Sequence, residues 1–169
     1  DNMSDVYLMI SLDVIKEKYY SEKVFYQTQL GIDEEAWNDF KQGKRSLSAE
    51  NTQKLKNLFT DYEWMLFQKV LRQTVVYPEK RGIAVKEYRK MKYLIASKWM
   101  NHQLAKVEIV EESNQNQEKQ ALLLAVRLDY QEWGYDDILT FRVPARLQKQ
   151  LASDQIKLLD WFDEQIEEN

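Results

Sequence analysis

The chain has 169 residues, of which 44% are hydrophobic and 31% charged, enough to bury the core of one compact domain or two small ones. It contains no cysteine, which excludes disulfide scaffolds, thiolate zinc sites, iron–sulfur clusters and cysteine nucleophiles. No stretch has the roughly 18 consecutive apolar residues of a membrane helix, and no signal segment opens the chain, so we expect a cytoplasmic protein.

Charge is distributed unevenly along the chain, whose formal net charge is −4. Residues 1–66 carry 8 basic and 12 acidic side chains, residues 67–100 carry 9 and 2, and residues 101–169 carry 7 and 14. The segment 67–100 is therefore suited to attract polyanions, although the whole chain repels them weakly. The alternative interpretation is that the basic middle neutralises the acidic flanks within one fold.

The first 77 residues predict five helices joined by short connections. Apolar residues recur with helical spacing over residues 5–20, which predicts the first helix. Each of the next four helices is expected to begin at a residue that can cap it: Ser21, Asp33, Ser48 and Asp61. Gly31 and Gly43 are expected to end the second and third helices, and Pro78 the fifth, while the fourth is expected to run over Leu55, Leu58 and Phe59.

Residues 78–169 predict a mixed segment in which a helix is followed by strands. A helical pattern over 85–99 has a polar face with five cations: Lys86, Arg89, Lys90, Lys92 and Lys98. Alternating or continuous apolar residues then predict three strands, at 105–109, 121–128 and 139–143, with the second in the centre. The polar stretch 111–119 suits a hairpin tip, and an apolar stripe over 147–166 predicts a terminal helix.

The expected fold class is therefore α+β. A five-helix domain over residues 1–77 precedes a second domain, over residues 78–169, with a three-stranded antiparallel sheet and flanking helices.

The spacing between Lys23 and Gly43 suits a helix-turn-helix, which needs apolar residues where its helices meet and a glycine in the turn. Gly31 would make that turn and Ile32 would plug it. Four residues are expected to face inward: Tyr26, Leu30, Trp37 and Phe40.

With these residues in place, the segment QLGIDEEAWNDFKQGKRSLSAENTQKLKNLF resembles the lambda-repressor-like, or Xre-type, family of DNA-binding domains. The resemblance covers roughly residues 5–66, about a third of the chain. It implies sequence-specific binding of duplex DNA, usually as a dimer, with the third helix in the major groove. Four residues are then expected to contact phosphates: Lys41, Gln42, Lys44 and Arg45. Asn38 is expected to contact a base.

The third helix departs from the family's pattern because it is acidic. Its outward positions include Asp33, Glu34, Glu35 and Asp39, whereas such helices normally present neutral polar or basic residues. A carboxylate about 7 Å from a phosphate costs about 0.6 kcal/mol in a water-like dielectric. Four of them cost about 2 kcal/mol, close to a thirtyfold loss of affinity, which phosphate contacts can offset. Gln27, at a position usually taken by a small residue, is a second departure.

No residue pattern predicts a catalytic, metal or cofactor site. His102 is the single histidine, and a catalytic triad or a histidine metal site needs more partners. The four glycines are too scattered for a phosphate-binding loop. Acidic pairs such as Asp136 and Asp137 lie in predicted turns and are explained by solvated charge.

Two further surfaces have a functional and a structural interpretation. Trp133 and Tyr135 flank Gly134 in a predicted turn, where they either complete a core or anchor a partner or second subunit. The basic helix over 82–100 interleaves cations with aromatic residues, which suits either a solvated face or a nucleic-acid backbone.

The sequence thus predicts a cytoplasmic DNA-binding regulator whose second domain pairs two subunits or contacts an effector. The competing hypothesis is an adaptor that docks the acidic helix-turn-helix face onto a basic protein. An enzyme is not expected.

Overall fold

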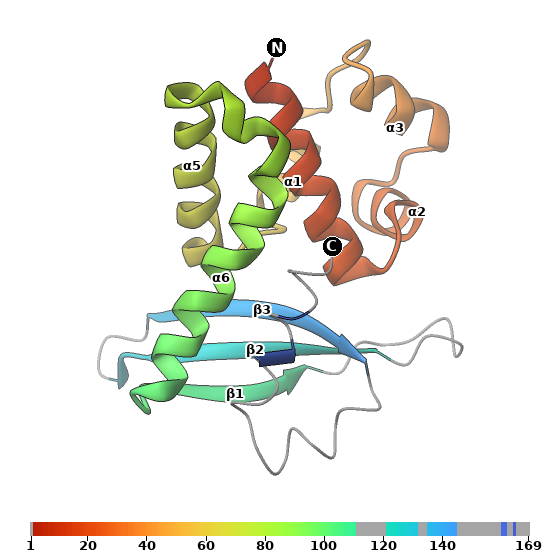
Figure 1. The fold of residues 1–169 in the computed structure, drawn as a ribbon. Coiled ribbons are helices and arrows are strands. Elements are labelled where there is room, and N and C mark those ends of the chain that lie inside the picture. The colour runs from red at the N-terminus through yellow and green to blue at the C-terminus, as the bar shows by residue number, and fades with distance from the viewer. Residues whose placement is uncertain (1, 111–120, 132–134, 145–159, 162–163, 165–169) are drawn as a thin grey trace. The chain divides into compact units, whose positions relative to one another are not determined.

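The computed structural model describes residues 2–110, 121–131, 135–144, 160–161 and 164 (Figure 1). These residues form helices and a three-stranded antiparallel sheet, so the fold class is α+β, as predicted. The chain divides into two compact units. The helical unit is Asp1–Phe59 with Phe67–Val85, and the sheet unit is Thr60–Leu66 with Lys86–Asn169. The domains expected from the sequence differ from these units in the placement of residues 60–66 and 78–85.

The helical unit is built from helical elements of very different length. They are α1 (Asn2–Tyr19), α2 (Glu22–Phe25), the π-helical turn η1 (Tyr26–Leu30), α3 (Glu34–Lys41), α4 (Ala49–Lys56), most of α5 (Asp61–Val76) and the 3-10 segment η2 (Pro78–Ile83). The side chains of Ser21, Asp33 and Ser48 accept hydrogen bonds that cap α2, α3 and α4, which confirms these predictions. Gly31 ends η1 with a φ of 64°, a left-handed conformation that a residue with a side chain rarely adopts.

Two predictions about helix ends are wrong. The predicted fourth helix over Leu58 and Phe59 stops earlier, because α4 ends at Lys56 and both residues lie buried in the turn that follows. The cap of α5 is Thr60 and not Asp61, since the Thr60 hydroxyl accepts the Glu63 N–H at 3.1 Å. The π-helical geometry of η1 and the 3-10 segment η2 are not predicted by the sequence pattern.

The core of the helical unit gathers the apolar stripe of α1 and the aromatic residues of later helices. Val6, Ile10 and Val14 recur every four residues on α1 and are almost completely buried. Phe67, in α5, packs edge-on against Tyr7 with ring centroids 5.3 Å apart. Lys18 Nζ donates a hydrogen bond to the carbonyl of Leu58, which ties the end of α1 to the turn after α4.

The sheet unit consists of the beginning of α5, most of α6 (Ala84–Asn101), and the strands β1 (Ala105–Val110), β2 (Ala121–Asp129) and β3 (Asp136–Pro144). The strand order is β1-β2-β3, so the apolar second strand is central, as predicted. Val126 of β2 faces Val107 of β1 and Leu139 of β3, and α6 crosses one face of the sheet (Figure 1). The predicted hairpin tip at 111–119 lies outside the described residues, as does most of the predicted helix at 147–166.

One buried carboxylate, that of Glu63, connects three elements of the sheet unit. Its Oε1 accepts the Thr60 N–H at 3.0 Å, which completes a capping box at the start of α5. Its Oε2 accepts the N–H and the hydroxyl of Thr140 in β3, at 2.9 and 3.0 Å. Lys92 Nζ of α6 lies 3.5 Å from the same oxygen. With four polar groups around it, the carboxylate is satisfied without water.

Lys92 does not lie on the exposed polar face of α6, where the helical pattern places it. Its side chain is only 3% exposed, and its ammonium group lies 5.0 Å from the ring centroid of Phe141 and 5.6 Å from that of Tyr88. The prediction is wrong because Glu63, 29 positions earlier, supplies a buried countercharge, and the two aromatic faces add cation–π attraction.

We expect the substitution Lys92→Met to lower the free energy of unfolding by about 3–5 kcal/mol, because it leaves the buried Glu63 charge without a countercharge. The double variant Glu63→Gln/Lys92→Met should lose less than the sum of the two single losses, since no uncompensated charge remains. Urea unfolding of the four proteins measures this coupling.

The exposed pair Glu50 and Lys54, separated by 3.4 Å, is the matched control. Each substitution there, Glu50→Gln or Lys54→Met, should change the free energy of unfolding by less than about 0.5 kcal/mol, and the two should add. Additive losses at Glu63 and Lys92 would contradict the proposed coupling.

Candidate nucleic-acid interface

The segment from α2 to α3 consists of two short helices joined by a tight turn. The N–H groups of Gly31 and Ile32 both donate to the carbonyl of Tyr26, which closes the turn. Tyr26 and Trp37 stack across the two helices, with ring centroids 5.8 Å apart at an interplanar angle of 28°. Asn51 of α4 donates its amide to the carbonyl of Leu30 at 3.2 Å. The turn is therefore stabilised both by the ring stacking between its two helices and by a hydrogen bond from α4.

A carboxylate also fastens α3 to α2. Glu22 Oε1 accepts a hydrogen bond from the indole of Trp37 at 2.8 Å and from Lys41 Nζ at 2.9 Å. Desolvation acts to raise the pKa of Glu22, but the hydrogen bonds from Lys41 and Trp37 and the charges of Lys41 and Lys16 outweigh it and lower the pKa. The carboxylate thus stays charged in the folded protein and fixes the orientation of α3.

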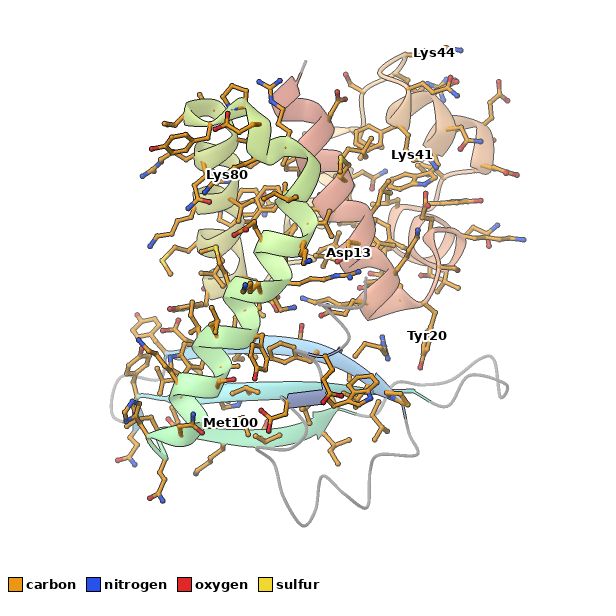
Figure 2. The ribbon with its side chains drawn as sticks, viewed as in Figure 1. Asp13, Tyr20, Lys41, Lys44, Lys80 and Met100 are labelled. Atoms are coloured by element: carbon orange, nitrogen blue, oxygen red, sulfur yellow. The ribbon has the colours of Figure 1, made fainter. Side chains whose placement is uncertain are left out.

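The five predicted DNA-contact residues lie close together along the chain, at the end of α3 and in the loop after it. Asn38 is half-buried, whereas Gln42, Lys44 and Arg45 are exposed. Lys41 is half-buried and bound to Glu22, so part of its charge is already neutralised. Figure 2 shows Lys44 at the outer end of the loop after α3.

The loop that carries the exposed cations is ordered by one backbone oxygen. The N–H groups of Lys44 and Arg45 donate to the carbonyl of Asp39, at 2.8 and 3.3 Å. Gly43, between these groups and α3, has a φ of 75° and lets the chain reverse. The cations are therefore presented from a fixed turn at the carboxyl end of α3.

The acidic residues of α3 are not equivalent. Asp33 accepts the Ala36 N–H at 2.8 Å and caps the helix, so its charge is used at the positive end of the helix dipole. Asp39 is half-buried, and Glu34 and Glu35 are exposed. All three carboxylates at the amino end of α3, those of Asp33, Glu34 and Glu35, are exposed.

A hollow of about 730 Å³ lies beside this loop, within the helical unit. Its lining mixes charged, polar and apolar groups: Asp5, Tyr7, Leu8, Phe40, Lys41, Gln42, Gly43, Arg45, Ser46, Leu47, Thr52 and Leu71. Sequence patterns did not indicate it, because the residues come from α1, α3, α4, α5 and a loop. Three of the predicted contact residues, Lys41, Gln42 and Arg45, belong to its wall.

For the remaining candidate residues the described part of the structure adds no support for a functional site. His102 is exposed just after α6, and among the described residues no group of three or more acidic or histidine side chains could hold a metal ion. Tyr135 is 75% exposed, and Trp133 lies outside the described residues. In the basic helix the three aromatic residues Tyr88, Tyr93 and Trp99 are buried, so they do not form an exposed stacking surface with the cations.

Neither the family models, the curated proteins nor the solved structures contain a match to this chain. Over the part of the chain that the structure describes, no helix is both long and apolar enough to span a bilayer.

We expect Glu22→Gln to lower the free energy of unfolding by about 1–3 kcal/mol at neutral pH, because the charged acceptor of two hydrogen bonds is lost. Since the pKa of Glu22 is lowered by folding, its contribution is complete above the ordinary glutamate pKa. The contribution disappears as the pH falls through the lower pKa of the folded protein. The difference between the native protein and the variant should therefore shrink between about pH 7 and about pH 3, as urea unfolding would show.

Glu35→Gln is the matched control, because Glu35 is exposed on the first turn of the neighbouring helix. Its effect should stay within about 0.5 kcal/mol. A Glu22→Gln effect that is equally small, or independent of pH, would contradict the assigned role of Glu22.

Proposed function

We propose that the protein is a DNA-binding transcriptional regulator of the cytoplasm that contacts duplex DNA through α3 and the loop after it. One observation carries the proposal: two short helices meet at the left-handed Gly31, and Glu22 locks the second of them to the first. This geometry supports a helix-turn-helix of the lambda-repressor-like kind, which the sequence of the same segment resembles.

The exposed side chains suit phosphate contacts at the edge of a groove. Lys44 and Arg45 extend from a fixed turn, and each cation that neutralises a phosphate releases condensed counterions. Gln42 adds a neutral hydrogen-bond donor, and Asn38, with two donors and an acceptor, is suited to an adenine edge. Lys41 serves two roles, because it holds Glu22 and lies next to the expected phosphate path.

The acidity of α3 opposes DNA binding. The capping hydrogen bond of Asp33 and the partial burial of Asp39 do not cancel the charges of these residues, so they count with those of Glu34 and Glu35. Four carboxylates at about 7 Å from phosphates cost about 2 kcal/mol in a water-like dielectric. Two phosphate contacts at physiological salt are sufficient to offset that amount.

Regulators of this kind bind as dimers, and we propose that the α+β part of the chain pairs two copies. Each copy then brings one α3 to the DNA, and the two half-sites follow the two-fold symmetry of the protein.

A second candidate function follows from the exposed Glu34 and Glu35. These two charges form an acidic corner at the start of α3 that suits a basic protein partner. In that case the protein is an adaptor, the helix-turn-helix serves as a scaffold, and duplex DNA is not bound.

The substitution pair Lys44→Glu/Arg45→Glu tests the proposal. Fluorescence anisotropy with duplex DNA should show at least a tenfold loss of affinity, because two phosphate contacts become two repulsions. The slope of log affinity against log salt should fall by about 0.9 for each lost contact. The circular dichroism melt should not change, since both side chains are exposed.

The control is Lys80→Glu/Arg81→Glu, which makes the same charge change in η2 of the same unit. This variant should bind DNA within about threefold of the native protein. Equal losses of DNA affinity in both variants would indicate that any surface cation attracts the DNA. No loss of affinity in either variant would refute the DNA-binding proposal.

A further inference from the structure

We propose that β1 is the dimer interface: two copies of the chain pair their β1 strands antiparallel, about a two-fold axis at Val107, to form a continuous six-stranded sheet. The inference rests on the dimer included in the proposed function, but not on DNA binding itself.

The two edges of the sheet differ in whether their backbone groups are occupied. At the edge of β3, the Thr140 N–H donates to Glu63 and the Ile138 carbonyl accepts the Thr60 hydroxyl at 2.6 Å. The beginning of α5 therefore closes that edge. Across the described residues β1 pairs with β2 alone, so its other edge has backbone groups without a strand.

β1 lacks most of the features that usually keep an edge strand from pairing. Its six residues follow β2 in continuous register, from Ala105 opposite Leu128 to Val110 opposite Leu123, so no bulge twists the edge away. It contains no proline. Ile109 and Val110 are 40% and 42% exposed, which leaves apolar surface for a partner to cover.

The sequence of β1 is complementary to itself in charge. When two copies of Ala105–Val110 run antiparallel with Val107 opposite Val107, Lys106 lies opposite Glu108 of the partner subunit, and Glu108 opposite the partner's Lys106. The Ala105 side chain then lies opposite Ile109 of the partner subunit. Among antiparallel two-fold registers, only the one centred on Val107 places these opposite charges face to face.

A second copy is the occupant that this pattern favours, because a two-fold interface must be self-complementary. A lone edge lysine would act only as a guard against pairing, but here the lysine is followed two residues later by a glutamate on the same face. Glu108 already lies 3.1 Å from Arg127 of β2, and Arg127 lies 2.7 Å from Asp136 of β3. Pairing of β1 would extend this charged ladder from one sheet into the next.

Variants of the 169-residue chain in which one charge of β1 is reversed test the proposal. Sedimentation equilibrium should show a dimer for the native protein, and Lys106→Glu or Glu108→Lys alone should raise the dimer dissociation constant by about tenfold or more, since each creates two like-charge pairs. An equimolar mixture of the two variants should form heterodimers as tightly as the native protein, because every cross-strand pair is again of opposite charge.

Lys86→Glu, at an exposed position of α6, makes the same charge change as Lys106→Glu and should leave the dimer constant unchanged. Melting curves check that each variant is folded. A monomeric native protein, unchanged constants in both single variants, or a mixture that stays monomeric would overturn the proposal. Loss of DNA binding with intact charge exchange would refute only the proposed function.

Discussion

The buried carboxylate of Glu63 is the constraint on which the sheet unit depends. A charge that is only 1% exposed needs several polar partners, and these come from three elements: the start of α5, the edge of β3, and Lys92 of α6. The same contacts that satisfy the charge also decide which sheet edge is closed. Among the described residues β1 pairs with β2 alone, which is the basis of the proposed dimer.

A second carboxylate has a similar function in the helical unit. Glu22 binds Trp37 and Lys41, so the orientation of α3 is set by polar contacts as well as by the stacked aromatic core. Lys41 therefore has a structural contact with Glu22 in addition to its proposed contact with DNA. Because Lys41 neutralises Glu22, the net positive charge available to a nucleic acid comes from the loop after α3 and not from the helix itself.

Much of the fold could be predicted because its signals are local. The caps Ser21, Asp33 and Ser48 and the left-handed Gly31 depend on a few neighbouring residues, and the central position of β2 follows from its continuous apolar run. The Thr60 and Glu63 capping box also has a local signal in the sequence, a Thr-x-x-Glu spacing, which the prediction of Asp61 as the cap overlooks.

Three of the features that sequence reasoning missed depend on residues far apart in the chain. Lys92 looks like one more cation of a polar helix face until Glu63 and the ring of Phe141 surround it. The hollow beside α3 has walls from four helices and a loop, and no spacing rule brings these together. The hydrogen bond from Lys41 to Glu22 joins residues 19 positions apart, and neither residue alone predicts it.

Selection of bound duplexes from a random library, followed by anisotropy at two salt concentrations, is the direct test of DNA binding. We expect enrichment of a two-fold symmetric site whose affinity falls steeply with salt, because the proposed contacts of Lys44 and Arg45 in each copy are with phosphates. A folded protein that enriches no duplex at low salt would refute DNA binding and favour the adaptor with its acidic corner at α3.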